Sequence, residues 1–522
     1  MSSWTKFWRN CKSRLSAISR CCYQSRNRWR QRWRGTRVAL EKEKAARARC
    51  ESELKAVERE NQQLRGQIEE LQRDVEQAKS ASPVRELPLG EPIPGHTYRA
   101  GMIALSVNLA REAGLRCTER VTRVIFDWLQ APQQIPCYQS TRGWMQQLGL
   151  DRLQRAKPVD DGIWLADHSV QVGQEKLLTI LRVPASRLPP KGTPLRHEDM
   201  ETICTQLGKE WKQADVLKVY QATAQRYGHP LGVLTDGAVE LREPAEQLEN
   251  KGKSPLVIRD LKHYLANRLE TMLSRCPHWQ KFLGLVASTR SGVQQTEMAH
   301  FTPLSLKLKA RFMNLEPLLK WATVLLWHVK HLTSQAREGI ALERFESKFG
   351  WLRDFESCLQ QWTECQCVIS AALTFFNNHG VYRGAATEFS RSLRGTLHYA
   401  SSRQLLKETL EFVRKVEKKL QPGQRLPIST EILESAFARF KQLEQQHSKA
   451  GFTSLILAFP ALLKPTTPEE ITESLGRVKV EDVRRYIKDN LPVTLTARRQ
   501  RTYREANRKK AQPRATQMKV AA

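Results

Sequence analysis

The sequence contains no apolar run of about 18 residues, the length that a helix needs to cross a bilayer. Its first residues include Trp and Arg where a secretory signal peptide would have an apolar segment. We therefore expect neither membrane insertion nor export. The 11 cysteines form no zinc-finger spacing, with neither two Cys-x-x-Cys pairs nor a Cys/His cluster, so we interpret them as reduced thiols of a cytoplasmic protein.

Acidic residues are also scarce, with 54 Asp and Glu against 85 Lys and Arg, and the formal net charge is +31. Residues 1–37 carry +11 and contain no Asp or Glu, and residues 497–522 carry +8, so the two ends supply +19 of that charge. Such a surplus favours a nucleic-acid partner, because neutralised phosphates release their counterions. We interpret 1–37, which also has four Trp residues, as a DNA-binding arm; a merely disordered basic arm is the alternative.

Residues 38–80 follow a heptad pattern that predicts a coiled coil. Apolar residues recur at spacings of three and four, and Asn61 occupies one core position of the repeat. A single buried Asn is typical of two-stranded coiled coils, so we expect a homodimer. The Pro- and Gly-containing residues 81–97 are predicted to be a linker.

Residues 98–158 are predicted to form three short helices of a helix-turn-helix-like DNA-binding domain. The helical spacing falls at 103–113, 118–129 and 141–148. Arg142, Trp144 and Gln146 lie in the third segment, where Arg and Gln side chains suit base edges in the major groove. An ordinary three-helix packing without a DNA-reading role is the alternative.

Residues 159–270 change to short apolar, β-branched runs at 163–170, 176–183, 231–235 and 256–259. Helices are predicted between them at 199–227 and 244–250. This order of elements predicts the first part of a ribonuclease-H-like α/β core, which 426–460 would complete with a last helix.

Three carboxylates fall where a two-metal nucleic-acid site needs them. Asp167 lies within the first predicted strand, Asp236 ends a later strand, and Glu434 lies on the predicted helix of 426–460. Period-two alternation places His168 on the opposite face from Asp167, so we assign that histidine a packing role. Glu431 lies in the first helical turn, away from the apolar stripe, where it would complement the helix dipole; Glu434 lies nearer the stripe and is our choice.

Carboxylate oxygens suit Mg²⁺ or Mn²⁺, and a pair of such ions can activate a hydroxyl and stabilise the leaving oxygen in phosphoryl transfer. We therefore expect a two-ion cofactor. Asp167, held rigidly on a central strand, would bridge both ions, and Asp236 and Glu434 would each bind one.

These motifs resemble those of a bacterial insertion-sequence transposase of the DDE type. The resemblance covers about residues 95–510 and rests on Ile-Trp-Leu-Ala-Asp-His-Ser-Val around Asp167, Leu-Thr-Asp-Gly around Asp236 and Ser-Thr-Glu-Ile-Leu-Glu-Ser-Ala-Phe around Glu434. The segment Asp260-Leu-Lys-His263 is similar to the Cys/Asp-x-x-His element of hAT-like transposases. The resemblance as a whole implies metal-dependent cleavage and joining of DNA ends, with Asp167, Asp236 and Glu434 as the catalytic residues and Asp260 and His263 in an auxiliary role.

Nearly 200 residues separate Asp236 from Glu434, and 271–425 is helix-like throughout. An all-helical insertion at this place is similar to those of hAT-like and Tn5-like transposases. Lys309 and Arg311 within it are candidate DNA contacts, although an exposed basic face is an equal alternative. Residues 461–522 are predicted to be a helical segment with a basic tail.

The sequence therefore predicts a transposase, with DNA as its partner and the bacterial nucleoid as its location. Two other interpretations stay open. One is a transposase-derived DNA-binding regulatory or architectural protein that has lost catalysis, and the other is a ribonuclease-H-like nuclease that cleaves without strand transfer. The products formed from DNA would distinguish the three.

Overall fold

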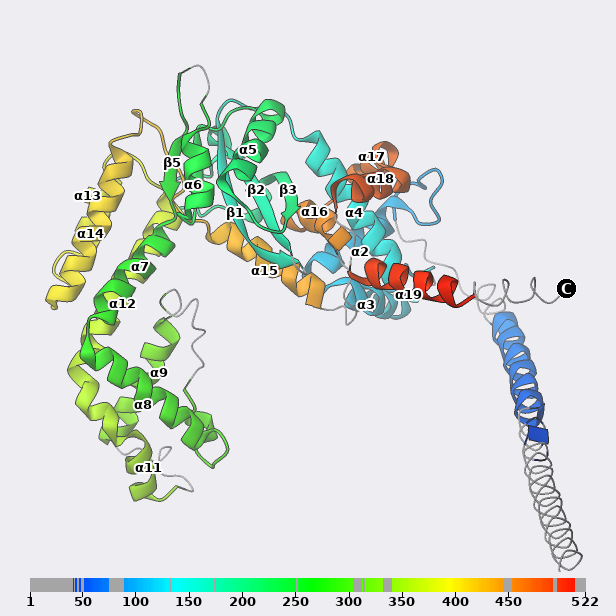
Figure 1. Ribbon diagram of the computed structural model, residues 1–522, viewed down its shortest axis with the longest axis horizontal. Helices are drawn as coiled ribbons and strands as arrows, with labels where there is room; N and C mark the ends of the chain where they lie inside the picture. The colour runs from blue at the N-terminus through cyan, green and yellow to red at the C-terminus, as the bar shows by residue number, and fades with distance from the viewer. Residues whose placement is uncertain are drawn as a thin grey trace, which may run out of the picture. The chain divides into compact units, whose positions relative to one another are not determined.

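A computed structural model describes residues 51–74, 89–131, 133–172, 175–249, 252–303, 315–331, 340–445, 453–491 and 495–511, with isolated residues at 41, 43, 44, 47 and 312. The chain divides into two units, Met1–Glu86 with Gln130–Pro132 and Leu87–Leu129 with Gln133–Ala522. The first unit contains a helix over 51–74, drawn in blue in Figure 1. Among the described residues, no helix combines the length and the apolar composition that a membrane crossing requires.

The second unit begins with three helices near the predicted positions. Helix α2 spans Ala100–Ala113, α3 spans Leu115–Trp128 and α4 spans Tyr138–Arg155. Gly114 joins the first two in a single-residue connection, at a φ of 82° that favours glycine. The chain therefore turns sharply between α2 and α3, and both helices contact α4.

Helix α4 is enclosed by elements from the far end of the chain. It contacts η6 (Thr453–Ala458), α16 (Phe459–Leu463), α17 (Pro468–Arg477) and α18 (Val480–Asn490). The buried Arg152 guanidinium donates to the Glu470 carboxylate, with Nη2 at 2.7 Å from Oε2, and to the carbonyl of Lys464. This pairing satisfies a charge that would otherwise be costly to bury, and it fixes residues 460–470 against α4.

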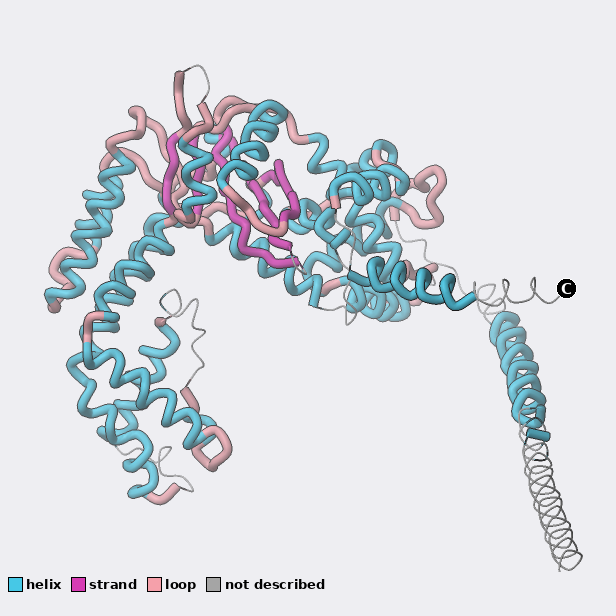
Figure 2. The backbone as a smooth tube through the Cα atoms, in the orientation of Figure 1, coloured by secondary structure: helices cyan, strands magenta, loops and turns pink. Residues whose placement is uncertain are grey.

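The strands form one five-stranded sheet, confined to a single region of the fold (Figure 2). Its order is β3-β2-β1-β4-β5, in which β1–β2 and β2–β3 are antiparallel while β1–β4 and β4–β5 are parallel. The strands are β1 Gly162–Val172, β2 Glu175–Pro184, β3 Glu201–Gly208, β4 Gly232–Thr235 and β5 Leu256–Arg259.

The prediction of a continuous helix over 199–227 is wrong in its first part, where the chain forms β3. Helix α5 begins only at Gln213 and ends at Tyr227. Thr202, Ile203 and Thr205 are β-branched residues that favour a strand, and β3 completes the ladder beside β2. The helix predicted at 244–250 is instead α6, Val239–Glu246.

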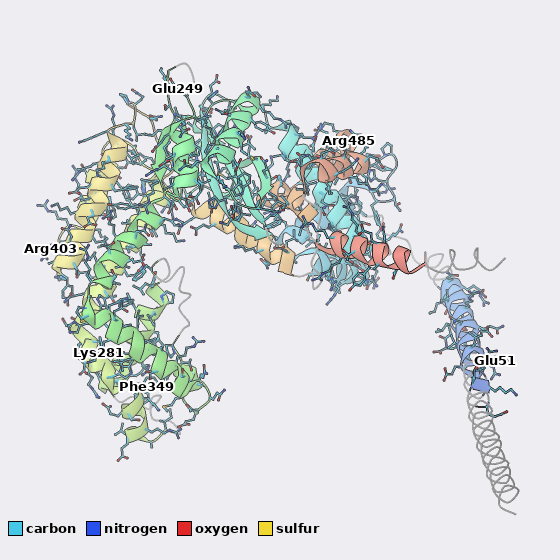
Figure 3. All side chains as sticks on the ribbon, viewed as in Figure 1. Glu51, Glu249, Lys281, Phe349, Arg403 and Arg485 are labelled. Carbon is cyan, nitrogen blue, oxygen red and sulfur yellow. The ribbon has the colours of Figure 1, made fainter. Side chains whose placement is uncertain are left out.

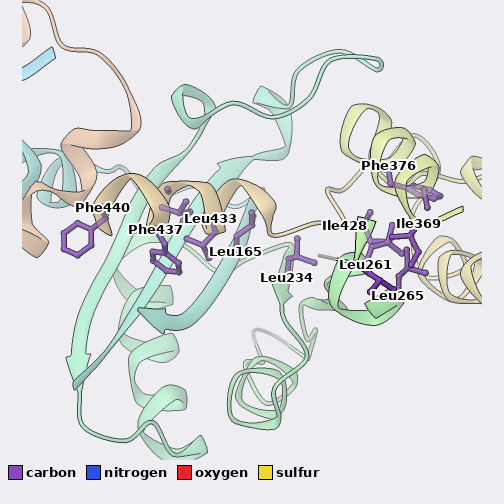
Figure 4. Close-up of a cluster of buried hydrophobic side chains, with 14 of the residues drawn as sticks. Leu165, Leu234, Leu261, Leu265, Ile369, Phe376, Ile428, Leu433, Phe437 and Phe440 are labelled. Carbon is purple, nitrogen blue, oxygen red and sulfur yellow. The ribbon is translucent and has the colours of Figure 1, made fainter. Parts of the chain in front are cut away.

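Helices cover both faces of the sheet. Trp164 and Ala166 of β1 share a core with residues of α5 and α6, whereas Ile163 and Leu165 belong to the core that includes α15, Glu431–Gln445. Alternation along β1 therefore assigns its odd-numbered residues to the α15 face. Figure 4 shows Leu433 and Phe437 of α15 beside Leu165 of the sheet.

Between β5 and α15, the described residues form helices and no strand; Figure 3 labels Lys281, Phe349 and Arg403 on three of these helices. Aromatic side chains build much of their interior, as in the edge-to-face pair Trp279–Trp362, whose ring centroids are 4.9 Å apart. The helices are α7 Leu261–Ser274, α8 Pro277–Val293, α9 Glu316–His331, α11 Leu342–Phe349, α12 Glu356–His379, α13 Ala385–Ser392 and α14 Ala400–Glu417. A last helix, α19, spans Leu495–Ala511.

Two glycines of α4 provide a matched test of its packing. A Cβ at Gly149 would lie 1.7 Å from the carbonyl oxygen of Leu457, whereas a Cβ at Gly143 would meet no atom within 4 Å. We expect Gly149→Ala to lower the free energy of unfolding by about 3 kcal/mol, because α4 must separate from η6. Gly143→Ala should raise it by about 0.5 kcal/mol through helix propensity. Urea unfolding of both variants checks this, and equal stabilities would contradict the described contact.

Candidate functional site

Asp167 and Asp236 lie at the same edge of the sheet. The parallel register of β1 and β4 pairs Leu165 with Leu234. Asp167 lies two residues beyond Leu165, within β1, and Asp236 lies two residues beyond Leu234, directly after β4. Asp167 is buried and Asp236 is half-buried. The Asp236 carboxylate accepts a hydrogen bond from the backbone N–H of Ala238 at 2.8 Å, which holds it at the turn beyond β4.

His168 lies on the other face of β1. Its Nε2 is 3.0 Å from Oε1 of Glu240 in α6, in the layer that also contains α5. The predicted separation of His168 from Asp167 agrees with this contact, and the histidine links β1 to α6 rather than joining the aspartates.

Glu434 belongs to the first turn of α15. Leu433, Ala436 and Phe437 bury the apolar stripe of the helix, and α15 contacts β1 on the face to which alternation assigns Asp167. The helix starts after Thr430, whose carbonyl accepts from the N–H of Glu434 at 3.1 Å. The buried stripe therefore holds α15, and Glu434 with it, against the sheet; Figure 4 shows Leu433 and Phe437 of this stripe.

The Asp260 carboxylate joins the elements of the site. It is fully buried, follows β5 and caps α7 by accepting from the N–H of His263 at 2.7 Å. Its second oxygen accepts from the N–H and the hydroxyl of Thr430, at 2.6 and 3.0 Å. One buried side chain thus fixes the end of β5, the start of α7 and the start of α15 relative to one another.

Lys262 of α7 reaches across to the first turn of α15. Its Nζ lies 3.0 Å from Oε2 of Glu434 and 3.2 Å from Oε1 of Glu431. Glu431 also accepts from Nδ2 of Asn377 at 2.5 Å, so its role is wider than the helix-dipole contribution that the sequence predicted. Oε1 of Glu434 is buried and has no hydrogen-bond partner in the described part of the chain.

The charges of the three candidate acids contribute to the pKa shifts of two neighbouring side chains, Tyr220 and His263. Burial, followed by the charges of Cys204, Asp236 and Asp167, raises the pKa of the Tyr220 hydroxyl. Burial lowers the pKa of His263, but the hydrogen bond and charge of Asp260, with smaller effects of Glu434 and Asp236, raise it overall. The charge of Asp236 therefore acts on Tyr220 together with that of Asp167, and on His263 together with that of Glu434.

The carboxylate oxygens of Asp167, Asp236 and Glu434 are the ligands that a hard divalent cation prefers, but the three side chains do not form a complete metal-binding cluster. Glu434 has one oxygen without a partner, while Lys262 is paired with its other oxygen. Within the described ranges, no group of three or more His, Cys, Asp or Glu side chains is arranged to hold a metal ion. Binding of a cation by all three acids would require their side chains to come closer together than they lie here.

The residues predicted to read DNA on the third helix lie in internal contacts. Trp144 is buried against Tyr98, with ring centroids 5.3 Å apart, and Gln146 donates to the carbonyl of Ser454 at 2.8 Å. Arg142 donates to the Ser454 hydroxyl, and burial lowers the pKa of its guanidinium. This face of α4 is therefore an internal interface, not a DNA-reading surface. Lys309 and Arg311 lie outside the described residues.

Two basic residues of the site were not identified from the sequence. Lys262 lies inside the Asp260–His263 motif, which was the available signal, and Arg259 immediately precedes it. Gly237 has a φ of 92°, and a Cβ there would lie 2.6 Å from Nε of Arg259. The glycine after Asp236 thus gives the Arg259 side chain space beside the acidic end of β4.

No protein-family model and no curated protein sequence matches this chain. Among solved structures, the chain is similar to the Drosophila P element transposase strand transfer complex. The TM-score is 0.32 and the sequence identity is 9%, and the match covers 76% of this chain and 93% of that chain.

The Asp260–His263 pair gives a pH-dependent test. The raised pKa of His263 means that its protonated form stabilises the fold; this contribution is complete below about pH 6.5, the ordinary histidine value, and is lost as pH rises through the raised pKa. The stability advantage of the parent over His263→Gln should therefore be larger at pH 6 than at pH 9. Unfolding midpoints at both pH values check this, and an advantage that grows with pH would contradict it.

Asp260→Asn should lower the free energy of unfolding by about 3 kcal/mol, because it removes one partner of a buried, charge-assisted network. The exposed Asp127→Asn, on α3, is the matched control and should change little.

Proposed function

We propose that this protein is a DDE transposase that catalyses metal-dependent DNA cleavage and strand transfer at the ends of an insertion sequence. The observation that carries the proposal is the position of Asp167, within β1, level with Asp236, directly after the adjacent parallel strand β4, with Glu434 on the helix that covers the same face of β1. The β3-β2-β1-β4-β5 order and the covering helices support a ribonuclease-H-like core, and the helices between β5 and α15 would be its insertion.

In this proposal Asp167, Asp236 and Glu434 would hold two Mg²⁺ or Mn²⁺ ions. When bound, such ions would stabilise the charges on the attacking and leaving oxygens of phosphoryl transfer. Asp260 positions Glu434 through Thr430, since it hydrogen-bonds the residue that starts α15. Lys262 balances the charge of Glu434 and lies where its ammonium could turn toward a DNA phosphate.

The charge of the whole chain supports DNA as the substrate. The net charge of +31 exceeds what solubility requires and favours a polyanion, with +8 contributed by residues 497–522. Over the described part of α19, residues 498–507 are exposed and include four Arg. We propose that this helix follows the DNA backbone.

A second candidate is a transposase-derived DNA-binding regulatory protein without catalysis. The observation that favours it is the ion pair of Lys262 with Glu434, in which a side chain of the protein itself neutralises the third acid. Such a protein would bind DNA and form neither cleaved nor joined products.

The decisive experiment incubates the protein with the DNA that flanks its coding sequence and Mg²⁺ or Mn²⁺. We expect cleaved and joined products, and a rate at least about 100-fold lower for Asp167→Asn, Asp236→Asn and Glu434→Gln, since each loses a ligand for transition-state charge. The exposed Glu411→Gln on α14 is the matched control.

The pattern of products decides among the candidates. Parental rates in all three site variants would overturn the assignment, and a loss in Glu431→Gln without one in Glu434→Gln would make Glu431 the third acid. Cleavage without joining would favour the nuclease, and binding without cleavage the regulatory protein.

We further propose that the helix over 51–74 pairs with a second copy of this chain. Leu54, Val57, Leu64, Ile68 and Leu71 form its heptad seam, with exposed fractions between 48% for Leu64 and 62% for Leu71. Apolar side chains at these heptad positions would be buried in a two-stranded coiled coil, and Asn61 would select the dimer. A dimer would bring two DNA ends together.

The seam is tested by Leu64→Asp against Gln63→Asp, which adds the same side chain one position away on the outer face. We expect Leu64→Asp to convert the dimer to a monomer by light scattering, because a charge would be buried at the seam, and Gln63→Asp to remain dimeric. A parental mass in both variants would exclude this seam as the dimer contact.

A further inference from the structure

A cavity of about 450 Å³ lies at the end of the sheet away from the candidate acids. We call it the basic pocket. It is formed between the end of α4, the Arg182 end of β2, the start of β3 and the end of α16. Its described lining contains one carboxylate, Glu201, and six cations: Arg152, Arg155, Lys157, Arg182, Arg187 and Lys464.

The basic pocket is distinct from the carboxylate site. Arg182 lies opposite Trp164 in the β1–β2 ladder, two pairs from the Gly162–Pro184 pair that begins it, whereas Asp167 lies opposite Thr179. Three strand positions of about 3.4 Å each therefore separate Asp167 from Trp164, the residue opposite Arg182.

Two of the arginines form the walls and have their donors occupied. Arg152 donates to Glu470 and to the carbonyls of Lys464 and Pro465. Arg182, almost fully buried, donates to Glu201 and to the carbonyl of Tyr227. Arg152 and Arg182 therefore stabilise the walls of the pocket and have few free N–H donors left for a ligand.

Each nearby carboxylate is shared by two guanidinium groups, so positive charge is left over. Glu470 accepts from Arg152 and, at 3.0 Å, from Arg155. Arg155 also lies 3.6 Å from the carboxylates of Asp151 and Glu473, and Arg477 shares both of these. Glu201 accepts from Arg182 and, at 2.9 Å, from Arg187. Arg155 and Arg187 are the more exposed member of each set, and both line the cavity.

Lys464 adds a cation that has no carboxylate of its own. Its side chain is half-buried, and its ammonium makes no ion pair within the part of the chain that the structure describes. Burial, followed by the charges of Arg152 and Arg155 against those of Glu470 and Glu201, lowers its pKa. Arg152 fixes its backbone by donating to its carbonyl at 3.0 Å, so the unpaired ammonium is held at the pocket.

We propose that the basic pocket binds a phosphate group, held by Lys464, Arg155 and Arg187. A phosphate offers several acceptor oxygens to guanidinium and ammonium donors around one centre, and its charge offsets the surplus of cations over carboxylates in the lining of the pocket. The site does not depend on the proposed transposase activity. The phosphate belongs either to a DNA backbone or to a small phosphorylated molecule.

The first test is binding of inorganic phosphate to the full chain by calorimetry. Lys464→Gln should weaken binding at least about tenfold through the loss of one charge-assisted contact, and Arg187→Gln should also weaken it. Lys209→Gln, exposed at the end of β3 beyond the pocket, is the matched control and should bind as the parent does. Equal phosphate affinity in the parent and Lys464→Gln would overturn the proposal.

The second test uses pyridoxal phosphate, whose aldehyde condenses with a neutral lysine amine to give an imine and water; borohydride then fixes the adduct for mass spectrometry. We expect Lys464 to be labelled faster than Lys209, and faster by pyridoxal phosphate than by pyridoxal. Equal rates for the two reagents at Lys464 would show that the phosphate is not recognised and would overturn the proposal.

Protection of Lys464 identifies the source of the phosphate. If a short DNA duplex blocks labelling at concentrations where a nucleoside monophosphate does not, the ligand is a backbone phosphate. If the monophosphate protects and the duplex does not, the ligand is a small molecule. Both results support a phosphate site, and absence of protection by the duplex, the monophosphate and inorganic phosphate would reject it. None of these readouts requires DNA cleavage.

Discussion

The candidate site depends on the buried carboxylate of Asp260. This side chain accepts hydrogen bonds from His263 at the start of α7 and from Thr430 at the start of α15, although 170 residues of sequence separate Asp260 from Thr430. The pKa of Asp260 is lowered despite burial, because the hydrogen bonds from His263 and Thr430 stabilise its charged form. A helical segment can therefore leave the sheet after β5 and return at α15 with Glu434 still held above the face of β1.

Charge is balanced locally in this chain even though its total is strongly positive. At the acidic edge of the sheet, Lys262 pairs with Glu434 and Glu431, and Arg259 packs over the turn that follows Asp236. At the other end, the described lining of the basic pocket contains six cations and one carboxylate, which leaves the pocket positive. The candidate acids and the cation-rich lining of the basic pocket therefore lie at different ends of one sheet.

Helix α4 shows why the helix positions could be predicted and their surroundings could not. Its apolar spacing indicated a helix, and a helix is present over Tyr138–Arg155. Gln146 suggested a polar surface for DNA, yet it donates to the carbonyl of Ser454, and the adjacent Gln147 donates to that of Val478, both more than 300 residues away in sequence. A buried amide with a backbone partner and an exposed amide that reads a base have the same local sequence, so only the tertiary contacts distinguish them.

The sequence by itself determined the four strands of apolar and β-branched residues, the alternation that separates Asp167 from His168, and the burial of the α15 stripe beside Glu434, because these follow from short-range periodicity. It missed β3, where β-branched residues became a strand by pairing with β2. The tertiary structure alone decided that Lys262 meets Glu434, that Asp260 holds Thr430, and that Arg155, Arg187 and Lys464 line one cavity. Each of these contacts joins side chains from distant segments, and the folded backbone, rather than any local pattern, brings such groups together.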